Sequence, residues 1–284
     1  MELVALSPVF GFEVRGLDLG FPLPPDEAQG LRRAWSRGSL LVFRGQKMDD
    51  AALVRFSRHF GELELPPASS TRRAGDGGIT TQPEIWVISN VVENGKPIGA
   101  LGYGEAEWHT DMSYIDTPPT ASVLYGLEVP PVGADTWFAS QHAAFEGLPA
   151  ELKEKLAGRR VNHDSSYTSA GELRSGASAP VTPDRAPGAR HPIVRTHPET
   201  GRPALYLGRR RNGWIEGLKI EESEALLDRL WAECVRDDYV YKHKWQQGDL
   251  LIWDNRAVVH RRDAFDNAHR RVLLRTQVRG NKPF

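Results

Sequence analysis

The sequence predicts a mainly β protein with added helices, built as a closed or sandwiched antiparallel structure. Three observations lead to this prediction. Short runs of β-branched, aromatic and other apolar residues, each of strand length, recur along the chain. Helical patterns are few and scattered between them. The 284 residues contain no internal repeat and no long linker, so we expect one domain spanning residues 1–284.

The bounds of the individual helices and strands follow from hydrophobic periodicity and from residues that typically begin or end such elements. Proline and aspartate at 24–26 open the first helix, and Asp49 with Asp50 can cap the second. The expected helices cover residues 24–35, 51–60, 141–156 and 221–236. The expected strands cover residues 40–43, 86–89, 122–127, 136–139, 193–196, 204–207, 239–245, 250–253 and 272–278.

Two stretches, residues 66–83 and 165–192, fit no element. Both are rich in Ser, Ala, Gly, Pro and Arg. Long irregular segments in a compact domain are either plain surface loops or covers over a site. We expect them to be lid loops.

Composition narrows the class of protein. Lys plus Arg total 36 and Asp plus Glu total 37, so the balanced charge favours neither a nucleic-acid partner nor a membrane surface. No apolar run approaches the length of a membrane span. The single cysteine, Cys234, cannot form an internal disulfide, which fits the cytoplasm. We therefore expect a cytoplasmic protein that acts on a small molecule.

A His-x-Asp pair, His109 and Asp111, is the first candidate for chemistry. On a strand, residues two apart project to the same face, so the imidazole and the carboxylate could converge on a metal ion. Alone this pair is weak, because a chain with nine histidines often contains one by chance.

His260 is the candidate third ligand, and it follows a strand-like run at 249–252. Two imidazoles and one carboxylate leave three positions open on an octahedral ion, which suits iron(II) that must bind a chelating co-substrate and dioxygen. Structural zinc sites are closed by four ligands, usually including several cysteines, and this chain has one.

Downstream, Arg271, Leu273 and Arg275 share one face of a predicted strand. If that face points into a barrel, the buried guanidinium groups need an anion, and a dicarboxylate is a natural partner. A surface strand with solvated arginines is the alternative reading.

These features, taken together, resemble the TauD/TfdA family of iron(II)- and 2-oxoglutarate-dependent dioxygenases. The resemblance runs along nearly the whole chain. The ordered blocks that carry it lie at 16–18, 41–46, 60–63, 108–111, 133–136, 191–198 and 253–256, and in the terminal arginine strand.

The resemblance implies a double-stranded β-helix, the cupin-like jelly roll. It implies that His109, Asp111 and His260 hold iron(II). It also implies that Arg271 and Thr136 bind 2-oxoglutarate, which is decarboxylated to succinate and carbon dioxide as dioxygen is used to hydroxylate the substrate. Family members often associate, so we expect a homo-oligomer.

Substrate residues are carried over from the same resemblance. Arg275 matches an arginine that grips the anionic group of the substrate in the taurine enzyme. The chain has Pro66 and Ser69 where that enzyme has a histidine and a tyrosine, and Glu105 where it has an asparagine. A carboxylate near a sulfonate is repulsive, so we expect an aryloxyalkanoate-like or other carboxylate rather than taurine.

Other readings stay open. Tyr103 could line an aromatic-friendly cavity, and Glu105 could instead recognise an amine or hydroxyl of the substrate. A jelly-roll metal-dependent hydrolase or isomerase and a non-catalytic binding module are the alternative classes. Arg271 with Thr136 favours the dioxygenase, since a hydrolase needs no dicarboxylate clamp.

Overall fold

The computed structural model describes residues 1–66, 79–101, 103–104 and 106–284. Its main feature is a pair of facing β-sheets. The larger has eight strands in the order β1-β2-β3-β17-β9-β19-β4-β7 and the smaller has the order β16-β10-β18-β8. Most neighbouring strands are antiparallel, and the two sheets form the predicted jelly roll.

The strands of the larger sheet are β1 (Glu2–Ala5), β2 (Phe12–Arg15), β3 (Leu40–Phe43), β17 (Leu250–Asp254), β9 (Ala121–Glu128), β19 (Val272–Val278), β4 (Trp86–Ser89) and β7 (Ala100–Leu101). Those of the smaller sheet are β16 (Val240–His243), β10 (Thr136–Ser140), β18 (Val258–Arg262) and β8 (Ala106–His109). Short pairs β5 (Val92–Glu93) with β6 (Lys96–Pro97) and β13 (Val194–Thr196) with β14 (Pro203–Leu205) lie outside them.

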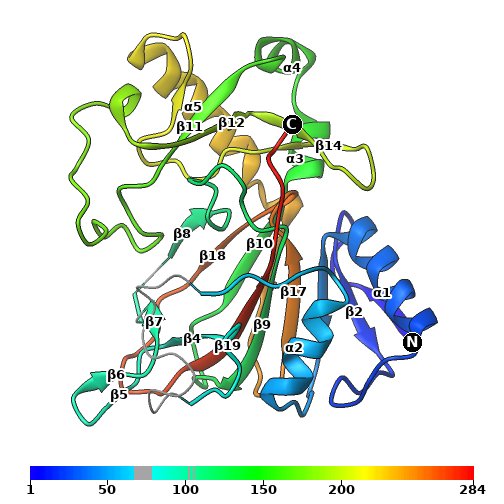
Figure 1. Ribbon diagram of the computed structural model, residues 1–284. Helices are drawn as coiled ribbons and strands as arrows, with labels where there is room; N and C mark the ends of the chain where they lie inside the picture. The colour runs from blue at the N-terminus through cyan, green and yellow to red at the C-terminus, as the bar shows by residue number, and fades with distance from the viewer. Residues whose placement is uncertain (67–78, 102, 105) are drawn as a thin grey trace.

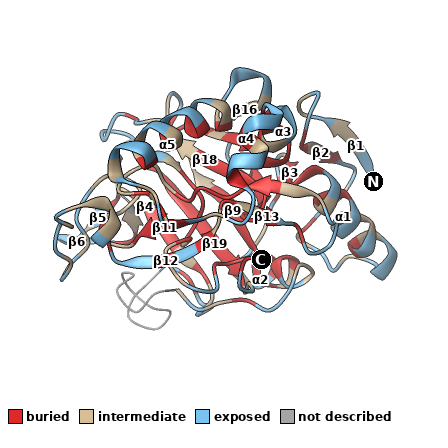
Figure 2. Ribbon diagram, turned by 90° about the horizontal axis from the view of Figure 1, so that it is seen from above, coloured by how far each residue is buried: buried red, intermediate tan, exposed pale blue. Residues whose placement is uncertain are grey.

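Alternation along the central strands separates two cores. On β17, Leu250 and Ile252 belong to the outer cluster, and Leu251 and Trp253 belong to the cluster between the sheets. Side chains of a strand alternate between its faces, so one strand contributes to both cores. Figure 2 shows these central strands as buried and the outer faces of the helices as exposed.

Helices α1 (Pro25–Gly38) and α2 (Asp50–Arg58) cover the outer face of the larger sheet (Figure 1). Pro25 stands at the first position of α1, where its missing N–H costs nothing. The Asp49 carboxylate accepts a hydrogen bond of 2.7 Å from the Ala52 N–H at the start of α2. The predictions for both helices and for this cap are confirmed.

A second layer lies beyond one end of the barrel, at the top of Figure 1. It contains a three-stranded sheet and the remaining helices around their own apolar cluster. Its elements are α3 (Gln141–Gly147), α4 (Ala150–Leu156), β11 (Arg160–Asp164), β12 (Gly188–Pro192), β15 (Trp214–Ile215), α5 (Ile220–Cys234) and the 3₁₀ turns η1 (Pro183–Arg185) and η2 (Asp237–Tyr239).

Some sequence expectations were wrong. The helix expected over 141–156 is two helices, because Pro149 holds Leu148 in an extended conformation at ψ 141°. The last five residues of the 165–192 stretch form β12, which pairs with β11. Strand β18 was not predicted at all. The 66–83 stretch falls largely outside the described residues, at 67–78.

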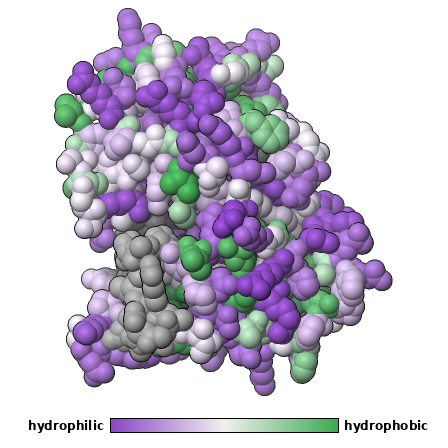
Figure 3. Space-filling view, viewed as in Figure 1, coloured by the Kyte–Doolittle hydropathy of each residue, from purple (hydrophilic) through white to green (hydrophobic). Residues whose placement is uncertain are grey.

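No helix in the described part of the chain is long and apolar enough to cross a membrane. On the face in Figure 3, hydrophilic side chains predominate and hydrophobic ones form small separate groups.

Candidate active site

His109 and His260 face each other across two paired strands of the smaller sheet. His109 is the last residue of β8, His260 lies in β18, and the two are register partners. Asp111 does not lie on the strand with His109, as the sequence argument assumed. It lies in the turn that follows, where Met112 has a φ of +47°. The turn, rather than strand periodicity, brings the carboxylate back to the imidazoles.

Thr110, between the two candidate ligands, anchors this turn. Its hydroxyl lies 3.0 Å from the Asn255 carbonyl oxygen and 2.8 Å from that of Val258, and its N–H donates to the Gly208 carbonyl at 2.9 Å. The chain on either side of Thr110 is therefore held against the β17–β18 connection. Its buried side chain positions the site without reaching into it.

The three candidate ligand atoms converge. His109 Nε2 is 3.6 Å and His260 Nε2 is 3.7 Å from Asp111 Oδ1. All three ligand atoms lie within 4.8 Å of one another, and all three residues are buried. The Glu107 carbonyl oxygen lies 2.7 Å from His109 Nδ1, which favours a proton there and leaves the Nε2 lone pair toward the centre.

The protonation states also suit a metal. Burial, and then the His109 ring beside it, lowers the pKa of His260 to about 3, so the imidazole is neutral. Burial by itself would raise the pKa of the Asp111 carboxyl, but Arg275 and the two histidines hold it well below its usual range. A neutral imidazole and an ionised carboxylate are the forms that bind metal ions.

A cavity of about 70 Å³ opens beside these ligands, between the sheets. Its walls are partly apolar and partly cationic. The apolar part includes Ile88, Ala106, Leu124, Trp253 and Ala170, and the cationic part is Arg262, Arg271 and Arg275.

Arg271 is a buried cation in the wall of this cavity, and its surroundings favour a bound anion. Among the described residues its NH1 group has no hydrogen-bond partner. Burial lowers the pKa of Arg271 well below its usual range, and the nearby Arg262 guanidinium lowers it further. Both guanidinium groups flank the Phe265 ring, at 5.8 and 5.7 Å from its centroid. A carboxylate in this cavity would offset the cost of burying these charges.

Thr136 reaches the same cavity from β10, where it is the register partner of Arg262. Its hydroxyl accepts a hydrogen bond of 2.9 Å from Trp245 Nε1, so its own proton is left for another acceptor. The structure therefore brings together the two residues that the sequence assigned to 2-oxoglutarate.

The four predicted substrate residues lie in different parts of the structure or outside its described residues. Arg275 lies inside the cavity, where its guanidinium pairs with Asp111. Tyr103 is 51% exposed, and its carbonyl oxygen accepts from the Phe265 N–H. Glu105 and Ser69 lie outside the described residues. The sequence analysis did not identify Arg262. The one indication was that it follows His260 by two residues and so shares a face of β18, but that strand was not predicted.

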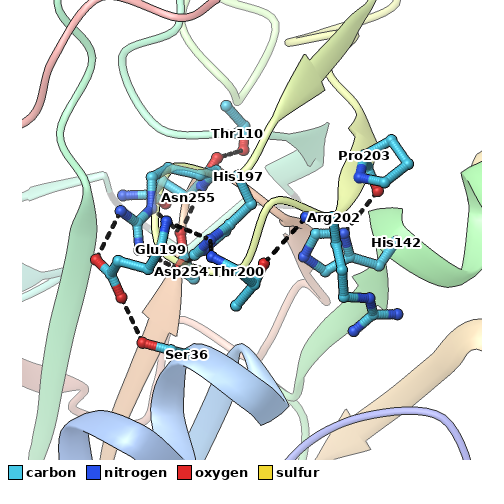
Figure 4. Close-up of polar contacts among 11 residues, drawn as sticks. Ser36, Thr110, His142, His197, Glu199, Thr200, Arg202, Pro203, Asp254 and Asn255 are labelled. Carbon is cyan, nitrogen blue, oxygen red and sulfur yellow. Dashed lines mark hydrogen bonds and ion pairs between the residues drawn. The ribbon is translucent and has the colours of Figure 1, made fainter.

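Behind the site, a buried polar network braces the β17–β18 connection (Figure 4). His197 Nε2 lies 2.9 Å from Asp254 Oδ2, and Arg256 grips the same carboxylate through two nitrogens at 2.8 and 2.7 Å. Arg256 also pairs with Glu199, which accepts from Ser36 of α1. The network ties the second layer and α1 to the connection that precedes His260.

Comparison with known proteins decides the family. The model of the taurine catabolism dioxygenase TauD, TfdA family matches residues 2–277. The chain belongs to the TauD/TfdA family. It is a 2-oxoglutarate-dependent dioxygenase, whose cofactor is iron(II) and whose co-substrates are 2-oxoglutarate and dioxygen.

Relatives align with nearly the whole chain. The chain is 33% identical to the alpha-ketoglutarate-dependent 2,4-dichlorophenoxyacetate dioxygenase of Cupriavidus pinatubonensis, over 97% of both chains. It is 28% identical to the (S)-phenoxypropionate/alpha-ketoglutarate-dioxygenase of Sphingobium herbicidovorans, over 99% of this chain and 95% of that protein. A crystal structure of AAD-2 with Mn(II) and N-oxalylglycine superposes with a TM-score of 0.80 at 29% identity, covering 99% and 98% of the chains.

Proposed function

We propose that this dioxygenase binds iron(II) through His109, Asp111 and His260, and 2-oxoglutarate through Arg271 and Thr136, to hydroxylate a small organic anion. The observation that carries the proposal is the buried Arg271, whose NH1 group has no hydrogen-bond partner among the described residues. It lines the same cavity as His109 and His260 of the His-Asp-His cluster. A dicarboxylate such as 2-oxoglutarate can bind a metal ion at one end and pair with a guanidinium at the other.

The residues present fit that assignment. When bound, iron(II) with 2-oxoglutarate and dioxygen supplies the oxidation that converts a C–H bond to C–OH and releases succinate and carbon dioxide. The protein orients the reactants. Arg271 and Thr136 hold the distal carboxylate, and Ile88, Leu124 and Trp253 exclude water from the cavity.

The substrate we propose is an aryloxyalkanoate-like or other small carboxylate, with a sulfonate less favoured. Two relatives named for aryloxyalkanoates align over nearly the full chain. Arg275 lines the cavity, and its Nε has no partner in the described part of the chain, so it can still donate to a substrate anion. A substrate with an amine or hydroxyl recognised by Glu105 is the alternative.

We further infer that residues 165–187, the irregular part of the stretch expected to be a lid at 165–192, cover the cavity. Ser169 and Ala170 line it, and the Glu107 N–H donates to the Ser169 carbonyl at 2.8 Å. Arg209 donates to the Tyr167 carbonyl at 2.8 Å and anchors the same segment. These contacts support a cover over the cavity that is anchored to β8, the strand that carries His109.

The test is succinate formation from 2-oxoglutarate in air with added iron(II). The substrate panel contains aryloxy carboxylates, other carboxylates, sulfonates and amine-bearing compounds. We expect coupled succinate and hydroxylated product with at least one carboxylate. Absence of succinate with every compound, in protein loaded with metal, would contradict the proposal. Turnover restricted to amine-bearing compounds that have no acidic group would contradict the anion assignment.

The homo-oligomeric state and the cytoplasmic location stay predictions. Sedimentation of the purified chain checks the first, and fractionation of the producing cell checks the second.

A further inference from the structure

The hydroxyl of Ser122 lies behind the Asp111 carboxylate, on the side away from the histidines. Ser122 is fully buried, at 0% exposure, in β9 at the middle of the larger sheet. Its register partners are Trp253 of β17 and Gln277 of β19. Two flanking strands therefore fix its backbone, and its side chain points between the sheets, on the same face as Leu124.

Four polar groups meet at this hydroxyl. Ser122 Oγ is 2.7 Å from Asp111 Oδ2. The other three groups are donors, namely Arg275 NH2 at 3.1 Å, Asn255 Nδ2 at 3.1 Å and Gln277 Nε2 at 3.3 Å. A hydroxyl has one proton and two lone pairs, and an ionised carboxylate only accepts. The Ser122 proton therefore goes to Asp111, and its two lone pairs are shared among the three donors.

The two oxygens of Asp111 are consequently not equivalent. Oδ2 contacts both Ser122 and the Arg275 guanidinium. Oδ1 is the oxygen near the two histidines, at 3.6 and 3.7 Å from their Nε2 atoms. Oδ2 is held by protein groups, and Oδ1 faces the position proposed for the metal.

We propose that Ser122 is a positioning residue that, with Arg275, keeps Asp111 a one-oxygen ligand of the metal ion. This inference rests on the proposed function, because it needs His109, Asp111 and His260 to be the metal ligands. A second carboxylate oxygen on the metal would take one of the three positions that a chelating co-substrate and dioxygen require. Ser122 thus preserves the open face of the site and also orients Arg275.

The experiment uses cobalt(II) as the probe, with the full-length apo protein and no co-substrate. Ser122→Ala removes the donor, and Ser122→Cys keeps the space filled with a weak donor. Ser223→Ala is the matched control. That serine is equally buried, at 0% exposure, and its hydroxyl accepts from the Ile215 N–H in the second layer, away from the metal ligands.

Two quantities are measured for each protein, the cobalt(II) dissociation constant and the visible absorption spectrum of the cobalt(II) form. We expect both Ser122 variants to bind cobalt(II) about 10–100-fold more weakly, as is typical when a partner of a ligand is lost. We also expect their spectra to change, because an Asp111 carboxylate no longer held by Ser122 meets the metal in a different geometry. The Ser223 variant should match wild type in both. If Ser122→Ala fails to fold, Ser122→Cys gives the same comparison.

Wild-type affinity and an unchanged spectrum in a folded Ser122 variant would overturn the inference. An equal loss in the Ser223 variant would overturn it too, because the effect would then be general loosening. Failure of the wild-type protein to bind cobalt(II) at all would instead refute the metal site of the proposed function.

Discussion

The Arg275 guanidinium and the Asp111 carboxylate form a buried ion pair on the side of Asp111 away from the histidines. Their side chains are 8% and 6% exposed, so solvent screens the pair little. One arginine therefore keeps the metal-binding carboxylate ionised and lines the cavity where the substrate is proposed to bind.

Replacing Arg275 by Leu is expected to lower the free energy of unfolding of the apo protein by about 3–5 kcal/mol, because Asp111 is left as an unpaired buried charge. Urea unfolding measures it. Arg270→Leu is the control, since Arg270 pairs with Glu128 at the surface and should leave the midpoint near wild type. Equal small effects of both changes would show that the buried pair does not hold this carboxylate.

Metal binding should stabilise the protein through Asp111. Cobalt(II) at about 100 times its dissociation constant should raise the free energy of unfolding by about 2.7 kcal/mol. Asp111→Ala should abolish the gain, because the two remaining imidazoles are a poor site by themselves. His243→Ala, at a buried histidine bonded to Asp249 away from the cluster, should keep it. Thermal unfolding with and without cobalt(II) decides, and a gain retained in Asp111→Ala would mean that the ligand assignment is wrong.

Arg271→Lys should weaken 2-oxoglutarate more than the prime substrate. An ammonium cannot reproduce the two parallel hydrogen bonds of a guanidinium to a carboxylate. We expect the KM for 2-oxoglutarate to rise about tenfold and the KM for the prime substrate to change less. Steady-state kinetics with each varied in turn measures both, and an equal rise in the two constants would count against a dedicated clamp. Arg270→Lys controls for the loss of a nearby arginine.

His163 should make the protein less stable in mild acid. Burial, and then the His191 ring beside it, lowers the pKa of His163 well below its usual value, so the folded state holds it neutral. Its contribution is full above the unfolded pKa of about 6.5 and is lost as pH falls from there toward the folded pKa, by at most about 1.4 kcal/mol per pH unit.

Urea unfolding between pH 7.5 and 5, done at matched ionic strength, checks this prediction. His163→Leu should flatten the slope of stability against pH without removing it, because other histidines are also buried. His269→Leu, at an exposed histidine, is the control for the loss of an imidazole. An unaltered slope in His163→Leu would contradict the prediction.

The sequence was enough to predict the strands at 40–43, 86–89 and 272–278, which the structure has with the same bounds. The run at 40–43 is apolar over its whole length, and those at 86–89 and 272–278 are rich in β-branched, aromatic and other apolar residues. Strand β18 escaped because Val258–Arg262 contains a histidine and two arginines. Only the packing of the barrel makes that segment a strand, because His260 and Arg262 face a cavity there and Arg261 lies over the Trp108 and Trp137 rings.

By itself, the sequence determined the residue types and spacings from which the family, the iron site and the 2-oxoglutarate clamp were predicted. Those depend on a few side chains at set distances along the chain. The tertiary structure decided how Asp111 meets the histidines, through a turn rather than along a strand. It also decided that Ser122, unremarkable in the sequence, lies behind Asp111. The first depends on the pairing of β8 with β18, and the second on β17, β9 and β19 lying side by side. These strands are far apart in the chain, and such long-range pairing leaves no local pattern to read.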